Sequence, residues 1–180
     1  MRLTLMSILL FLGISNGYAD GYSWYIKGQE AYMVKEYDKA REYWEKAIIE
    51  GGPDETFNNL GYLWFHGLGG KANHNIAIDF WRKASALSVS ESQWHLGYAY
   101  ETGQGVQTDL VLAYAWYKCA IATSQGLDDL ANLMIGQDAR KSLSAVTPKL
   151  TKEELNKAEN IASKLISKYA LKVKLNTHEF

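Results

Sequence analysis

Two glycine-rich segments of this chain contain residue types that could hold a phosphate group. The segment Gly67–Lys71 places a lysine after three glycines, but Ala72 stands where a phosphate-binding loop needs a serine or threonine to bind the metal ion. In the second segment, Gly103 and Gly105 are followed by Thr108, where the dinucleotide-binding pattern requires a third glycine. Both segments are therefore predicted to be turns between helices.

The histidines and the cysteine also give no reaction centre. The four histidines lack metal-ligand spacing, although His66 and His95 could approach each other across neighbouring helices. No serine or cysteine stands in a recognisable nucleophile motif. The single cysteine, Cys119, cannot form an internal disulfide and is predicted to be a buried, unreactive thiol. The sequence therefore predicts no catalytic residues, no cofactor and no metal site.

Two stretches of the chain are copies of each other, 36 residues apart. The first runs from Leu60 to Ala84 and the second from Leu96 to Ala120, with glycines, alanines and paired aromatic residues at matching positions. A period of this length is typical of arrays of helical hairpins, in which each hairpin buries its apolar face against its neighbours. Such arrays generally present a surface to a partner.

We expect an all-α fold with three antiparallel helix hairpins and two closing helices. No segment shows the alternation of a β-strand. The last helix is predicted to open with a capping box from Thr151 to Glu154. The helical repeat domain should cover residues 20–175, followed by a frayed tail at 176–180. The predicted hairpins cover about residues 21–50, 54–87 and 89–124, and the closing helices about 127–145 and 151–172.

Small residues are predicted to set the distance between the helices of each hairpin. Gly28, Gly61 and Gly97 lie at the same place in the first helix of each pair. A glycine inside a helix costs about 1 kcal/mol relative to alanine, so its use three times at one register predicts close packing. Large rings of the second helices should fill the core between hairpins. These rings belong to Trp44, Trp81, Trp116 and Tyr117.

The two copies resemble the Sel-one-like repeat (SLR) family, which is related to tetratricopeptide repeats. The third hairpin matches the family pattern throughout, whereas the second departs at Gly70 and Asn73, where valine and aspartate are usual. The resemblance implies a right-handed superhelical array that binds proteins or peptides. Many bacterial members are exported. The matching positions are Leu96, Gly97, Tyr100, Gly103, Gly105, Val106, Asp109, Ala113, Trp116, Tyr117 and Ala120.

The first 19 residues have the pattern of a secretory signal. Arg2 precedes an apolar stretch from Leu3 to Ile14, and small residues lead to a cleavage site expected after Ala19. The stretch is too short to span a bilayer comfortably, and an uncleaved N-terminal helix is the alternative. We expect a periplasmic or secreted protein without a transmembrane span after cleavage. The net charge of -1 gives no indication of a nucleic-acid partner.

A partner-binding face is predicted from the position of the packed glycines. In stacked hairpins the first helices line the concave wall, and the inward positions lie three residues before, one after and four after each glycine. Six of these nine residues are aromatic, and tyrosine and tryptophan are frequent interface anchors. The alternative is that several pack beneath the closing helices. The nine residues are Tyr25, Gln29, Tyr32, Asn58, Tyr62, Phe65, Trp94, Tyr98 and Glu101.

The sequence therefore predicts an exported module that binds a protein or peptide on its concave aromatic face. A first alternative is an immunity protein that neutralises a secreted antibacterial toxin such as a lipase, which would form a tight one-to-one complex. A second is a hydrolase acting on envelope substrates, which would need a polar catalytic cluster. A third is an envelope scaffold with several weak partners.

Overall fold

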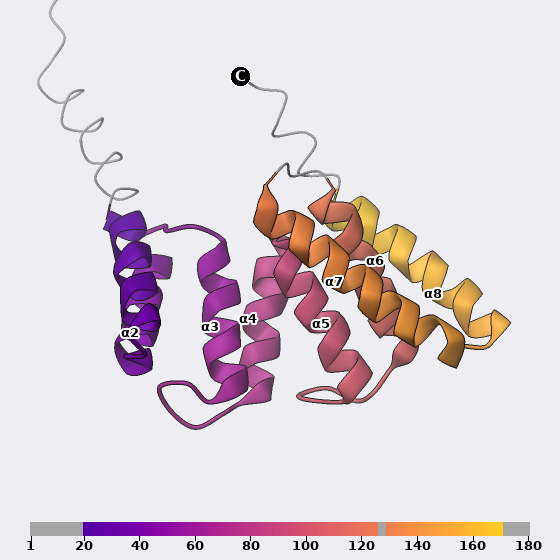
Figure 1. The fold of residues 1–180 in the computed structure, drawn as a ribbon, viewed down its shortest axis with the longest axis horizontal. Helices are drawn as coiled ribbons and strands as arrows, with labels where there is room; N and C mark the ends of the chain where they lie inside the picture. The colour runs from indigo at the N-terminus through magenta and orange to yellow at the C-terminus, as the bar shows by residue number, and fades with distance from the viewer. Residues whose placement is uncertain (1–19, 126–128, 171–180) are drawn as a thin grey trace, which may run out of the picture. The chain divides into compact units, whose positions relative to one another are not determined.

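The computed structural model describes residues 20–125 and 129–170 (Figure 1). Every regular element in those two ranges is a helix, so the all-α prediction is confirmed. The predicted signal at residues 1–19 and the predicted frayed tail at 176–180 lie outside the described residues. The chain divides into two compact units, residues 1–72 and 73–180.

The N-terminal unit contains the first hairpin and the first helix of the second. Residues 20–33 form a helix, which is followed by α2 (Tyr37–Ile49) and α3 (Glu55–His66). The C-terminal unit contains α4 (His74–Ala86), α5 (Ser90–Thr102), α6 (Leu110–Ser124), α7 (Leu130–Val146), the short helix η1 (Thr147–Lys149), α8 (Lys152–Leu165) and the π-helical turn η2 (Ile166–Ala170).

Each predicted glycine-rich turn follows a helix that a glycine ends. Gly67 closes α3 with φ of 67°, and Gly103 closes α5 with φ of 75°. These values lie in the left-handed region, which glycine adopts at little cost because it has no β-carbon. The glycines are therefore needed for chain reversal, as the sequence predicted.

Side-chain caps fix where several helices begin. The Asn73 and Asp109 carboxamide and carboxylate oxygens accept backbone N–H hydrogen bonds at the starts of α4 and α6. Thr151 and Glu154 form the predicted capping box at the start of α8. The helix expected from residue 127 begins at Leu130, because Asp129 accepts from the Asn132 N–H and acts as its cap.

The first hairpin is packed around Gly28 in the manner expected from its glycine. A β-carbon at Gly28 would overlap the indole of Trp44, which is buried in α2. Trp44 Nε1 donates a hydrogen bond to the carbonyl oxygen of Tyr25 at 3.2 Å. The indole therefore lies directly against the backbone of the helix at residues 20–33, and the predicted close approach is confirmed here.

The third hairpin repeats this contact with a different ring. A β-carbon at Gly97 in α5 would lie 2.5 Å from two ring carbons of Tyr117, which is fully buried in α6. Tyr117 belongs to a core cluster that also includes Tyr114 of α6, Val146 of α7 and Ala158 of α8. The glycine thus sets the distance between α5 and α6, while the ring joins the hairpin to the closing helices.

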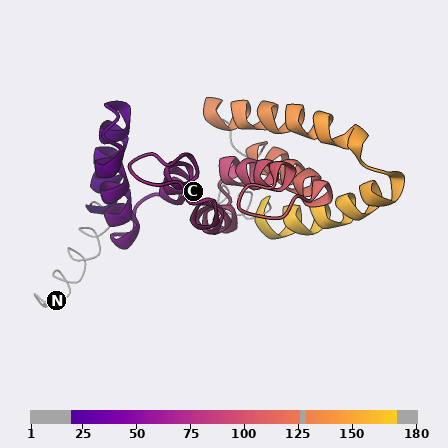
Figure 2. The same cartoon turned by 90° about the horizontal axis from the view of Figure 1, so that it is seen from below.

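The two closing helices enclose α6. In Figure 2, α7 and α8 lie on opposite sides of α5 and α6, and both pack against α6. On the α8 side, Glu159 accepts hydrogen bonds from Tyr114 Oη at 2.6 Å and from Lys118 Nζ at 2.8 Å. Both bonds hold the pKa of the Glu159 carboxyl below its usual range, Lys118 contributing most.

The cysteine has the environment expected of an inert thiol. Cys119 in α6 is fully buried, and burial raises the pKa of its thiol to about 12. Because the thiolate is the reactive form, this side chain is a poor nucleophile near neutral pH.

We expect Gly97→Ala to lower the free energy of unfolding. The new methyl group would meet the buried Tyr117 ring, and overpacking costs about 1–3 kcal/mol, more than the roughly 1 kcal/mol that alanine gains in a helix. Urea denaturation followed by circular dichroism would measure the change. Unchanged or increased stability would show that α5 and α6 do not depend on this close contact.

Candidate functional site

The nine residues predicted to face a partner lie on three helices in two units. Those of the helix at residues 20–33 and of α3 belong to the N-terminal unit, and those of α5 belong to the C-terminal unit. Each group is therefore a separate part of the candidate site.

The N-terminal unit brings the predicted tyrosines into a row of rings. The Tyr32 ring contacts the Tyr62 ring edge-on, with centroids 6.4 Å apart, and Tyr62 in turn lies 4.2 Å from the His66 ring. The Tyr32 ring also packs against the rings of Tyr37 and Trp44, with centroid distances of 5.5 and 5.7 Å. Stacking and edge contacts of this kind fix ring orientations. The orientations of these rings are therefore fixed by contacts within the N-terminal unit.

Two further predicted residues extend this row along the first helix. Tyr25 is half-buried and its ring lies 6.2 Å from that of Tyr22. Gln29 accepts a hydrogen bond from Asn59 Nδ2 of α3 at 3.3 Å. The structure thus places Tyr25, Gln29, Tyr32 and Tyr62 on partly exposed positions of two neighbouring helices. We name these four residues the aromatic row.

Two residues predicted on α3 are buried instead. Asn58 is 3% exposed and Phe65 is 7% exposed. α3 buries six of its twelve residues, so its packed arc is wide and includes positions that the glycine offsets assigned to the open face. Asn58 and Phe65 therefore stabilise the fold and present little surface to a partner.

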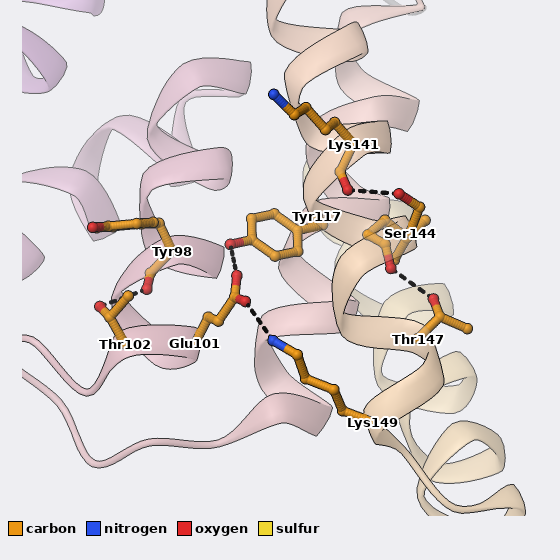
Figure 3. Close-up of polar contacts among 9 residues, drawn as sticks. Tyr98, Glu101, Thr102, Tyr117, Lys141, Ser144, Thr147 and Lys149 are labelled. Carbon is orange, nitrogen blue, oxygen red and sulfur yellow. Dashed lines mark hydrogen bonds and ion pairs between the residues drawn. The ribbon is translucent and has the colours of Figure 1, made fainter.

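The part of α5 predicted to be open is partly covered by α7 and η1. Trp94 Nε1 donates to Ser142 Oγ of α7 at 3.2 Å, and the Trp94 ring packs against the core around Tyr117. Glu101 accepts from Tyr117 Oη at 2.8 Å and from Lys149 Nζ at 3.1 Å (Figure 3). Of the three predicted residues on α5, only Tyr98 is exposed, at 38%. Trp94 therefore contacts α7, and Glu101 contacts α6 and η1.

The polar contacts around Tyr117 connect helices that are distant in sequence. Burial, followed by the hydrogen bond to Glu101, raises the pKa of the Tyr117 hydroxyl far above its usual value. Lys149 neutralises the Glu101 carboxylate from the solvent side. The Tyr117 hydroxyl therefore stays protonated, and its partners hold α5, α6 and η1 together.

The part of the chain that the structure describes contains neither a metal-ligand cluster nor a membrane-spanning helix. Within residues 20–125 and 129–170, no three histidine, cysteine, aspartate or glutamate side chains are close enough to hold a metal ion. None of the helices in these ranges combines the length and the apolar character needed to cross a bilayer.

The positions counted from the packed glycines did not include several exposed apolar residues on two helices. Tyr22, Ile26 and Met33 are exposed on the helix at residues 20–33, and Leu133 and Met134 are exposed on α7. Their helical spacing was visible in the sequence, but the pattern alone gave no reason to place them outside the core.

Comparison with known proteins places the repeat among characterised sequences and structures. The sequence pattern of the Sel1 repeat matches residues 16–51, 58–89 and 90–122. A protective antigen present in uropathogenic Escherichia coli strains, which displays an SLR fold, is 26% identical with a TM-score of 0.73, over 89% of this chain and 33% of that one. A Sel1 repeat protein from Oxalobacter formigenes is 24% identical with a TM-score of 0.58, over 78% of this chain and 55% of that one.

The chain thus spans about a third of the first structure and just over half of the second. No curated protein matches it.

We expect Glu101→Leu to destabilise the protein more than Lys149→Ala. The first change leaves the buried Tyr117 hydroxyl without its acceptor, which costs about 1–3 kcal/mol. The second removes an ion pair whose lysine is half exposed, worth at most about 1 kcal/mol. Urea denaturation of both variants gives the comparison. Equal losses would mean that the Tyr117 hydrogen bond contributes little to holding α5 and α6 together.

Proposed function

This chain belongs to the Sel1 repeat family, and we propose that it is an exported module that binds a protein or peptide partner on the aromatic row. Proteins built from Sel1 repeats generally mediate protein–protein interaction, and the family is typically non-catalytic. Beyond this general role, we propose the aromatic row as the binding surface and the periplasm or the cell exterior as the compartment.

The observation that carries the proposal is the arrangement of rings on the N-terminal unit. Tyr32 and Tyr62 come from different helices and their rings meet edge to face, and Tyr25 lies on the same helix as Tyr32. Tyrosines held in this way offer a large contact area, lose little side-chain entropy on binding and keep a hydroxyl for hydrogen bonds. Gln29 adds an amide beside them. Tyr98 is the proposed contact on the C-terminal unit.

The other four predicted residues are not proposed as partner contacts. Asn58 and Phe65 are buried in α3, and Trp94 and Glu101 hold α5 to α7 and η1. Substituting these four would disturb folding together with binding, so they make poor probes of the surface.

Export is proposed from the signal pattern at residues 1–19. Cleavage after Ala19 would give a secreted chain that begins at Asp20, and the protein would then act in the periplasm or outside the cell. Terminal sequencing of the protein from a periplasmic extract tests this. An intact Met1 on the extracted chain would contradict the proposed processing.

We expect Tyr25→Ala combined with Tyr62→Ala to reduce partner capture from an envelope extract at least about tenfold, because interface anchors often carry 2 kcal/mol or more. The matched control is Leu133→Ala with Met134→Ala, which trims two exposed side chains of α7. Quantitative mass spectrometry of captured proteins would compare wild type, the double variant and the control. All three should keep the same helicity by circular dichroism. Equal capture by all three would reject the aromatic row as the binding surface.

A further inference from the structure

A row of exposed apolar side chains runs along the outer side of the helix at residues 20–33. Tyr22 is 57% exposed, Ile26 is 37% exposed and Met33 is 80% exposed. At 100° per residue these positions fall within roughly 40° of one another around the helix axis. We name Tyr22, Ile26 and Met33 the outer stripe. Large apolar side chains grouped in this way on a surface mark an interaction site more often than single ones do.

The outer stripe lies on the side of the helix that does not pack on α2. Gly28 and Ala31 are buried on the packed side, where the Trp44 indole rests against Gly28. The helical spacing places the outer stripe on the other side of the axis. It is next to the aromatic row, since the Tyr22 and Tyr25 rings are in contact at 6.2 Å. The two surfaces therefore form one continuous face of the N-terminal unit.

The geometry of the outer stripe favours a helical partner. The backbone N–H and C=O groups within a helix are already bonded to each other, so the helix offers no edge to which a strand could add. Met33 lies eleven positions after Tyr22, which corresponds to about 16 Å of helix. A partner helix of about three turns would cover this length, with its own apolar side chains between those of the outer stripe.

The charges of the N-terminal unit favour a basic partner. Residues 20–72 contain nine acidic and six basic side chains. Four of the six cations are already engaged: Lys27 and Lys46 lie over the Trp24 ring, Arg41 lies over the Trp64 ring, and Lys39 pairs with Glu36.

Glu30 supplies an exposed acidic group beside the outer stripe. It lies one helical turn after Ile26 and forms no ion pair with any residue that the structure describes. Its carboxylate is therefore available to a cation of a partner that covers Ile26.

We propose that the outer stripe docks a basic amphipathic helix of a partner protein. The apolar face of that helix packs on Tyr22, Ile26 and Met33, and a flanking lysine or arginine pairs with Glu30. This inference rests on the proposed function, since it names the chemistry of the partner segment that the N-terminal unit receives. It adds a surface that the repeat pattern did not indicate.

The test uses a fluorescein-labelled 14-residue amphipathic helix made of leucine and lysine, and its leucine–glutamate counterpart. Fluorescence anisotropy would measure binding of each peptide to the purified protein. We expect the lysine peptide to bind at least about tenfold more tightly than the glutamate peptide, and to weaken as salt is added. Ile26→Ala with Met33→Ala should weaken it about tenfold or more, because two apolar contacts are lost.

Glu30→Lys tests the electrostatic part separately. It should weaken the lysine peptide and strengthen the glutamate peptide, since it reverses the charge that selects between them. The control, Leu133→Ala with Met134→Ala, trims an exposed apolar pair on α7 and should leave both affinities unchanged. Circular dichroism would verify that each variant retains its helicity.

Several results would overturn the inference. These are no binding of the lysine peptide, equal binding of both peptides, or an equal loss in the α7 control. Analytical ultracentrifugation could instead show a dimer of the wild-type protein. If Ile26→Ala with Met33→Ala abolished this dimer, the outer stripe would bind a second copy of the chain. Peptide binding that only Tyr25→Ala with Tyr62→Ala removes would leave the aromatic row standing and reject the outer stripe.

Discussion

The close contact between a glycine of one helix and a ring of the next is the constraint on which the rest of the structure depends. Gly28 meets the Trp44 indole, and Gly97 meets the Tyr117 ring. In both hairpins the missing β-carbon lets a large side chain reach the helix backbone, which buries the ring and fixes the helix separation. The same contact decides which side of the first helix is covered, and so which side remains for a partner.

Much of the fold follows from the sequence because its signals are local. The 36-residue repeat and the glycine register predict the hairpins, and the caps at Asn73, Asp109 and Thr151 fix where three helices begin. Each cap acts within the first turn of its helix, and each repeat spans a single hairpin. The positions of the helices can therefore be predicted from the sequence, and the glycines indicate which helix faces pack against each other.

The candidate site is less predictable because it depends on contacts between distant segments. Glu101 and Lys149 are 48 residues apart in sequence, and nothing in the repeat pattern shows that η1 would reach α5. The prediction that Trp94 faces a partner likewise took no account of α7, where Ser142 accepts a hydrogen bond from the Trp94 indole. The candidate positions were also counted only from the packed glycines. They therefore lie on one side of the first helix and do not include Met33 on its outer side.

The central claim is that the glycine–ring contacts hold the most stable part of the first and the third hairpin. Native-state hydrogen exchange of the purified protein, read by NMR for each amide, tests it most directly. The account predicts that amides around Gly97 in α5 and Tyr117 in α6 exchange only through global unfolding. Those in the first turns of α7, where Leu130 and Leu133 are exposed, should exchange through smaller openings. Exchange around Gly97 as rapid as that at the start of α7 would contradict the account.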